Sequence, residues 1–455
     1  IDRARWTRPQ REKRRANTEM TMLPSAESIQ IIVPVASIAL LVMSLKNPVY
    51  GVIAYFVVLN AKLGDMYPVL GAVRFELIVA LFVMVRILFS TRGHGNFLPR
   101  VNPINTALWL LFAVGMISVA FSLFPGVSWN EGGYFLLKMT IFYIMIVTTV
   151  HTSADLSRIL WAFILITAWI AYEPVVNYIS GNVDEQLYGA VAVGRFGAAT
   201  GHVAFANTLN QVIPVLIFFA FRDRTMFVKT ISLAILGLLA FGVYASKSRG
   251  GFLGLFVTAM GIVYFSRDRM KAGIIAGAFM FVFLTIAASD YISHMSTITE
   301  GIHASRTASD RYLGLVNGVS MMIKRPVLGV GIGCYAEARR HYFHYYFYSH
   351  NLYGELFGEL GIASVVWFFF IYQIFKRASA IKRTLDPSRA RDTYYTNIIT
   401  AIQLGLFVRL FVGNFTHGSL IWFWFMMAAL TVAVQNILLQ EESFPLPEPD
   451  HMKPE

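Results

Sequence analysis

The chain contains Val228-Lys-Thr-Ile-Ser-Leu-Ala-Ile-Leu-Gly-Leu-Leu-Ala-Phe-Gly-Val-Tyr-Ala-Ser246, an apolar run in which Lys229 is the one charged side chain. A helix rises about 1.5 Å per residue, so a run of this length approaches the thickness of the hydrocarbon core of a bilayer. Because a lipid-facing segment must satisfy its own backbone hydrogen bonds, the run is predicted to be a transmembrane helix.

Similar apolar runs recur on both sides of this one. They fall at roughly 29–45, 49–63, 73–90, 104–122, 134–150, 156–179, 203–221, 251–266, 272–289, 351–375, 394–413 and 418–439. The predicted fold is all-α, a polytopic membrane helix bundle of about twelve transmembrane helices. The first two runs are short and are separated by Lys46-Asn47-Pro48, which predicts either a hairpin or a single broken segment.

The composition agrees with a membrane protein. Hydrophobic residues make up 56% of the chain and charged residues only 14%, whereas a soluble domain carries about a quarter. The net charge of +12 comes from short basic clusters between apolar runs, which argues against a nucleic-acid partner. The one cysteine, Cys334, excludes an internal disulfide and a cysteine-based metal centre.

Basic clusters predict the orientation of the bundle. Crossing counts place Arg92 to Arg100, Arg222 to Lys229, Arg267 to Lys271 and Lys376 to Arg391 on one side, which the positive-inside rule makes cytoplasmic. The expected organisation is a basic N-terminal segment set aside from functional reasoning (1–28), a transmembrane bundle (29–289), an outer loop (290–350), C-terminal transmembrane helices (351–440) and a cytoplasmic tail (441–455).

The long outer loop, 290–350, is the first candidate for function because it is far longer than a connection needs to be. An amphipathic helix is predicted between Ser309 and Arg325, lying on the membrane surface or on the bundle. The glycines at 329, 331 and 333 lack the Gly-Lys-Ser/Thr ending of a nucleotide-binding loop, so they predict a tight turn with close backbone approach.

The segment His341-Tyr-Phe-His-Tyr-Tyr-Phe-Tyr-Ser-His-Asn-Leu-Tyr353 carries three histidines and seven aromatic residues where the chain re-enters the membrane. One interpretation is an interfacial aromatic belt. The other is a sugar-binding platform with a histidine beside a reacting hydroxyl. A metal site formed by His341, His344 and His350 is disfavoured, because no carboxylate or cysteine lies at suitable local spacing.

Two arginines fall on the outer side, where the positive-inside rule disfavours them. Arg249 begins a span within Ser246-Lys-Ser-Arg-Gly-Gly251, and Arg195 precedes another span. A guanidinium donates two parallel hydrogen bonds to a phosphate, so these residues are diphosphate-binding candidates, and snorkelling to lipid phosphate is the alternative. Arg409 lies inside a predicted span and must face a cavity or a partner.

Three segments resemble the O-antigen ligase and O-antigen polymerase superfamily. They are Ser248-Arg-Gly-Gly-Phe-Leu253, the stretch from Asp310-Arg311 through Ser349-His350-Asn351 to Gly361, and Gly194-Arg195 to Asn207. The resemblance covers about 190–375 in sequence and the whole chain in topology, and it is closest to the O-antigen ligases. The Pro-Asn pair usual before the Asn-containing span is not intact here.

The resemblance implies a multi-pass glycosyltransferase of the bacterial inner (cytoplasmic) membrane with its active site facing the periplasm. Such an enzyme takes a glycan from an undecaprenyl-diphosphate-linked donor and transfers it to lipid A-core, or to another lipid-linked glycan, by an inverting, metal-independent reaction. The donor carries its own leaving group, so no cofactor is expected. Polysaccharide polymerase is the alternative, followed by a protein O-glycosylation ligase or a transporter.

The resemblance also implies residue roles. His350 is the catalytic base candidate, and Arg195, Arg249 and Arg311 are the donor-diphosphate candidates, with Arg249 also counted as catalytic. Asn351 and Glu359 are expected to support the site. Glu355 and Glu359 are expected to orient the histidine or an arginine, or else to be exposed on the helix surface.

Overall fold

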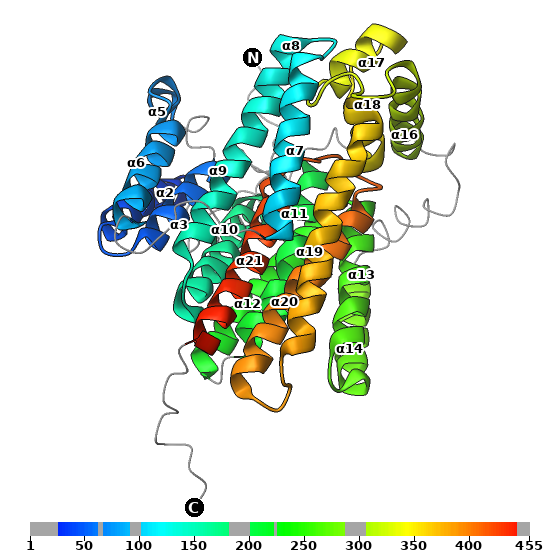
Figure 1. Ribbon diagram of the computed structural model, residues 1–455. Helices are drawn as coiled ribbons and strands as arrows, with labels where there is room; N and C mark the ends of the chain where they lie inside the picture. Colours follow the sequence, from blue (N-terminus) through cyan, green and yellow to red (C-terminus); the bar gives the residue numbers. More distant parts are fainter. Residues whose placement is uncertain are drawn as a thin grey trace, which may run out of the picture.

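The computed structural model describes residues 26–61, 67–91, 102–181, 201–222, 225–286 and 306–443. Within these residues the secondary structure is helical and contains no strand, which confirms the all-α prediction. Figure 1 shows long helices packed side by side, with short helices at one end of the bundle.

The helices of the first half precede residue 180. They are α2 (Ala26–Ser44), α3 (Pro48–Ala61), α5 (Pro68–Ala72), α6 (Phe75–Thr91), α7 (Pro103–Ala120), α8 (Pro125–Val127), the π-helical η1 (Ser128–Gly133), α9 (Tyr134–Thr149) and α10 (Ser153–Ile179).

The helices of the second half follow residue 201. They are α11 (His202–Phe219), η3 (Ala220–Arg222), α12 (Met226–Ala245), α13 (Arg249–Phe265), α14 (Arg269–Ile286), α16 (Arg306–Lys324), α17 (Tyr335–Phe343), α18 (Leu352–Leu360), η4 (Gly361–Ser364), α19 (Val365–Thr384), α20 (Ala390–Val412) and α21 (Trp422–Ser443).

The protein is a polytopic membrane helix bundle, and each predicted apolar run contains a helix. Among the described residues, 8 helices are long and apolar enough to cross a membrane, and α3 and α13 are shorter apolar helices. The first two runs form a helical hairpin, because α2 and α3 pack together around a tight turn in which Lys46 N–H donates to Met43 O (3.0 Å).

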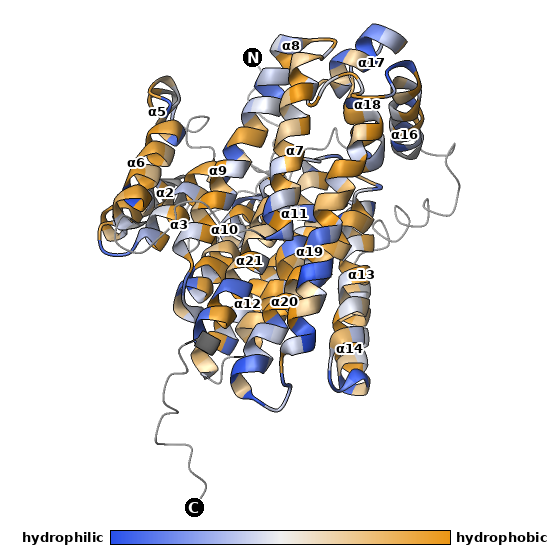
Figure 2. Cartoon of the chain, viewed as in Figure 1, coloured by the Kyte–Doolittle hydropathy of each residue, from blue (hydrophilic) through white to orange (hydrophobic). Residues whose placement is uncertain are grey.

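The bundle has two chemically different ends. Figures 1 and 2 show the hydrophilic turns α13–α14 (266–268) and α19–α20 (385–389) together at the lower end, which we name the basic end. The short helices α8, α17 and α18 lie at the opposite end together with the longer α16, and we name this end the loop end. Two of the four predicted basic clusters, Arg267 to Lys271 and Lys376 to Arg391, therefore reach the same end of the bundle, whereas Arg92 to Arg100 lies outside the described residues.

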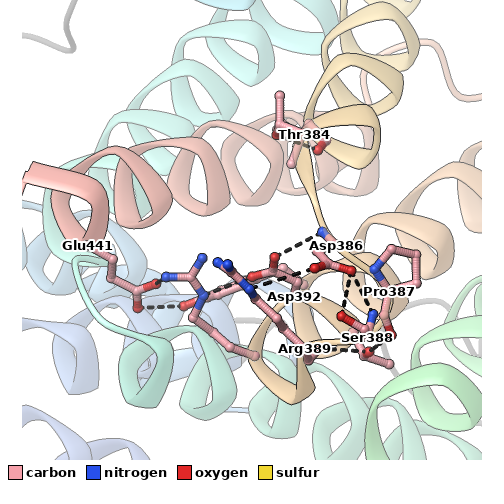
Figure 3. A network of polar contacts seen from close by, with 11 residues as sticks. Thr384, Asp386, Pro387, Ser388, Arg389, Asp392 and Glu441 are labelled. Atoms are coloured by element: carbon pink, nitrogen blue, oxygen red, sulfur yellow. Dashed lines mark hydrogen bonds and ion pairs between the residues drawn. The ribbon is translucent and has the colours of Figure 1, made fainter. Parts of the chain in front are cut away.

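Carboxylates order the most basic turn of the basic end, as Figure 3 shows. Asp392 accepts the Asp386 N–H (2.9 Å) and pairs with Arg391 (2.8 Å). Arg391 also lies 3.6 Å from Glu441 of α21. Asp386 in turn accepts the Ser388 N–H (2.9 Å) and hydroxyl (2.8 Å). The network ties α19, α20 and α21 together at this end.

At the loop end, α16 packs against α18 through glycines spaced four residues apart. A Cβ atom added at Gly314 would collide with Ser349 O, and one at Gly318 would collide with Gly354 O. Small residues at this spacing let two helix backbones approach closely. The predicted amphipathic helix therefore lies on the bundle, with Tyr312 exposed on its other side.

The glycine-rich segment after α16 forms the predicted tight turn. Gly329, Gly331 and Gly333 have φ of +61°, +112° and +78°, a region that side-chain-bearing residues rarely adopt. The turn approaches the backbone of α18 closely enough for Val330 N–H to donate to Gly358 O (2.9 Å). Glycine is required here by both conformation and space.

We predict that Gly318→Ala lowers the midpoint of thermal unfolding in detergent, because overpacking costs about 1–3 kcal/mol and here the neighbour is backbone. Gly277→Ala on α14 is the matched control, since a Cβ there meets nothing within 4 Å. Alanine in an open helical position is favoured by about 1 kcal/mol over glycine, so this variant should keep or raise the midpoint. A Gly318→Ala midpoint equal to wild type would contradict the close α16–α18 packing.

Candidate active site

The site is built on the loop 413–421, which joins α20 to α21 at the loop end. Asn351 caps α18, its Oδ1 accepting the Gly354 N–H (2.9 Å), and its Nδ2 donates to Asn414 O (3.3 Å). Leu352 N–H donates to Gly413 O (2.7 Å). The start of α18 is therefore hydrogen-bonded directly to this loop. Asn351, predicted to support the site, uses both polar atoms of its side chain to bond backbone groups.

His350 immediately precedes this cap and is held in a left-handed conformation with φ of +48°. A non-glycine residue with this φ is uncommon and is found where the surrounding structure imposes it. Its ring centroid lies 5.2 Å from that of His417 and 4.8 Å from that of Phe347. His417 in turn stacks on Tyr348 at 5.2 Å with an interplanar angle of 4°. Two imidazoles therefore meet edge to face among aromatic rings.

Two charged side chains hold the backbone around His417. The Arg409 Nη2 atom donates to His417 O (2.8 Å), and its guanidinium lies 5.8 Å from the Trp424 ring centroid. Glu355 Oε2 accepts the N–H groups of Gly418 (2.8 Å) and Ser419 (2.9 Å). The buried Arg409 thus has a partner inside the protein, as its position in a span required.

Glu359 is 4% exposed, so the alternative of a carboxylate on the exposed helix surface is wrong for this residue. Its Oε1 accepts the Tyr335 N–H (3.1 Å), which joins α18 to the start of α17. Like Glu355, it bonds to backbone N–H groups in the described structure.

The loop also brings two of the predicted arginines to one place. The Arg311 guanidinium of α16 lies 5.7 Å from the Phe415 ring centroid, and a Cβ at Gly250 would lie 2.9 Å from Phe415 Cβ. Arg249, the first residue of α13, therefore lies beside the same ring-bearing loop. Ser248 caps this helix by accepting the Gly251 N–H on its hydroxyl (3.1 Å). The third candidate, Arg195, lies outside the described residues.

Sequence reasoning missed Arg339, which is 2% exposed on α17. Its Nη1 atom donates to Tyr348 O (3.4 Å), and its guanidinium lies 5.2 Å from the Tyr345 ring and 5.7 Å from the Phe347 ring. Arg339 therefore holds the aromatic segment in place through one backbone hydrogen bond and two ring contacts. His417 was missed as well, because nothing in the sequence around it indicates its contact with His350.

The electrostatics keep both histidines neutral. Burial lowers the pKa of His350 below its usual value, the positive charges of Arg311 and Arg339 lower it further, and Asp310 opposes them. Burial lowers the pKa of His417 to about 3, assisted by His350 and Arg409. Its Nδ1 atom is buried without a hydrogen-bond partner in the described structure. At neutral pH both rings are therefore uncharged, and His417, with a pKa of about 3, is too weak a base to accept a proton there.

The other two histidines of the aromatic segment lie apart from this pair. His341 and His344 are exposed, and the His341 ring packs against Phe124 at 5.9 Å. Over the described ranges, no three or more His, Cys, Asp or Glu side chains are grouped to hold a metal ion. Tyr345 and Tyr346 remain exposed, as either a belt or a sugar platform requires.

The arrangement is that of a membrane protein whose loop end gathers arginines around a neutral histidine, a setting suited to group transfer from a phosphate-bearing donor. Residues 233–369 match the family model described as O-antigen ligase. The chain therefore carries a domain of the O-antigen ligase and polymerase superfamily, membrane enzymes that transfer lipid-linked glycans. The matched range includes Arg249, Arg311, Arg339 and His350, whereas Arg409 and His417 follow it. No curated protein matches the chain.

We predict that the acidic limb of the pH profile of kcat/KM for glycan transfer lies below pH 6.5, the ordinary His pKa. Arg311→Gln removes a cation that disfavours the protonated ring, so the pKa rises and the limb moves to higher pH. Arg340→Gln is the control, because that arginine is largely exposed and paired with Glu337. A limb that stays in place in Arg311→Gln would contradict the assignment of His350 as the titrating group.

Proposed function

We propose that this protein is an inner-membrane glycosyltransferase that transfers a glycan from an undecaprenyl-diphosphate donor to an acceptor hydroxyl on the periplasmic side. The acceptor we favour is lipid A-core, as for an O-antigen ligase. The observation that carries the proposal is that the loop 413–421 meets Arg311, the start of α13 and, through His417, the ring of His350, while residues 233–369 match the O-antigen ligase family.

The distribution of charge supports this orientation. The turns of the basic end carry Arg267, Lys271, Arg389 and Arg391, and positive loops remain in the cytoplasm. The loop end, which holds His350, then faces the periplasm (Figure 1). A donor whose polyprenyl tail lies in the outer leaflet reaches this end without crossing the membrane.

Arginines are suited to the donor because the diphosphate gains charge as it leaves. Arg249 lies at the N-terminus of α13, where the helix dipole also favours an anion. Arg311 approaches from α16, and Arg195 is the third candidate. Because the guanidinium groups stabilise the leaving diphosphate, neither metal nor nucleotide is required for the reaction.

The chemistry follows from this placement. His350 accepts the proton of the acceptor hydroxyl, and the oxygen attacks the anomeric carbon of the donor. The bond from that carbon to the diphosphate oxygen breaks, and the diphosphate keeps the electron pair. Attack opposite the leaving group inverts the anomeric configuration. His417 is a positioning residue here, since its ring lies against His350 and its backbone is fixed by Arg409.

A polysaccharide polymerase is the second candidate, because it uses the same donor and differs in its acceptor, another lipid-linked glycan. The family match favours both equally. The test is to reconstitute the purified protein in liposomes with a polyprenyl-diphosphate glycan and to add either lipid A-core or a second portion of lipid-linked glycan. Glycan on lipid A-core supports the ligase, longer lipid-linked chains support the polymerase, and no product with either contradicts both.

We predict that His350→Ala lowers the transfer rate about 10²–10⁴-fold, which is the usual contribution of a general base. Thermal unfolding should remain close to wild type. His344→Ala is the matched control, because this histidine of the same segment is exposed, and it should keep most of the activity. A His350→Ala rate above about a tenth of wild type would remove the residue from this role.

Arg249 is predicted to bind the donor through a two-oxygen fork. Arg249→Lys keeps the charge but loses the fork, so it should retain part of the activity, whereas Arg249→Ala should weaken donor binding at least about tenfold. The measurement is binding of a polyprenyl-diphosphate glycan in detergent. Arg389→Ala at the basic end is the control. Wild-type donor affinity in Arg249→Ala would place the donor site elsewhere.

A further inference from the structure

A cavity lies away from the histidine pair, between α3, α5 and α6 on one side and η1 and α9 on the other. Its volume is about 780 Å³, within the range of small-molecule sites. Its lining includes three charged residues, two large aromatic residues and an amide. These are Arg74, Glu76, Lys138, Trp129, Tyr134 and Asn130.

Among the residues that the structure describes, one cation of this cavity has no acidic partner. Lys138 Nζ lies 3.1 Å from Glu76 and 5.0 Å from the Tyr134 ring centroid. Arg74 is exposed and forms no ion pair with any residue in the described ranges. It adopts a left-handed backbone with φ of +50° between α5 and α6. Its guanidinium is therefore available to an anionic group of a ligand.

The polar and aromatic part of the lining has the chemistry of a saccharide site, and it lies beside the apolar residues Val58, Leu59, Leu70, Phe75, Leu77 and Phe135. Trp129 is 42% exposed and Tyr134 is 38% exposed, so both present ring surface on which the apolar face of a sugar can pack. Asn130 and Glu76 supply acceptors and donors that match sugar hydroxyls. A lipid tail would offer no hydrogen-bond partner to Asn130 and no counter-charge to Arg74, at a cost in free energy.

The part of the lining that carries Trp129 and Asn130 also contacts the glycine-rich turn that precedes α17. This part is η1, a π-helix, an element that often marks functional sites. Ser128 Oγ donates to Ile332 O (2.7 Å), and a Cβ at Gly333 would lie 2.6 Å from Gly132 N. The turn containing Ile332 leads directly into α17, which bears Arg339.

The cavity lies outside the part of the chain that matches the family. Its lining falls within 58–138, whereas the matched range is 233–369 and holds the donor-site arginines Arg249 and Arg311. Ligases and polymerases share a donor and differ in acceptor. The unmatched part is therefore where acceptor recognition is expected.

We propose that this cavity binds the acceptor through a saccharide that bears an anionic group. The sugar rings pack on Trp129 and Tyr134, and the anionic group pairs with Arg74. That the bound saccharide is the acceptor follows only if the proposed function is correct. That the cavity binds an anionic saccharide is argued from the residues of its lining.

The test uses the full-length protein in nanodiscs, with lipid A-core as a phosphorylated saccharide probe. Trp129→Ala and Arg74→Gln should each weaken lipid A-core binding at least about tenfold. They should raise the acceptor KM to the same extent and leave the donor KM unchanged. Trp109→Ala on α7 is the matched control, because Trp109 is also 42% exposed and does not line the cavity. Arg74→Gln alters an exposed side chain, so it decides the question if Trp129→Ala does not fold.

Three results would overturn the inference. Wild-type affinity for lipid A-core in both variants would mean that the cavity binds no saccharide. A rise in donor KM instead of acceptor KM would assign the cavity to the donor. Equal competition by phosphatidylglycerol would make it an anionic-lipid site. Binding that depends on Trp129 and Arg74, without any transfer by the wild-type protein, would support the cavity and contradict the proposed enzyme activity.

Discussion

The site depends on the hydrogen bonds that Glu355 accepts from the N–H groups of Gly418 and Ser419. Ser419 is buried, and an unpaired N–H group is costly away from water, so the non-helical backbone here needs acceptors from the protein. Arg409 completes the restraint from α20 by binding the carbonyl of His417. With both ends of this short segment bonded, His417 is fixed in position, and so is the ring of His350 against it.

The same loop explains why distant helices meet at one point. Phe415 contacts the start of α13 through Gly250 and the guanidinium of Arg311 on α16. The glycine contacts between α16 and α18 are equally necessary, since a larger residue at Gly314 or Gly318 would displace the helix that carries Arg311. Because the helix backbones lie close together at the loop end, the charge of Arg311 acts on His350, which lies on a different element.

Local pattern predicted most of the fold, because apolar runs and glycine conformations are properties of short segments. The turn at Gly329 to Gly333 was predicted from the glycines alone, and its positive φ values confirm the reason. His417 and Arg339 were missed because their importance comes from contacts with residues far along the chain or on another element. Glu359 was placed correctly on its helix, yet its burial depends on α17, which no local pattern around it reveals.

The position of His350 among cations has a consequence for the order of events in the proposed reaction. In addition to the effect of burial, Arg311 and Arg339 lower the pKa of His350. A bound diphosphate offsets those positive charges, so the imidazolium becomes less disfavoured and the ring becomes a stronger base. The histidine then accepts a proton most readily when the leaving group is in place. Donor binding and activation of the acceptor hydroxyl are thereby coupled through charge, without any change in the helices that hold the site.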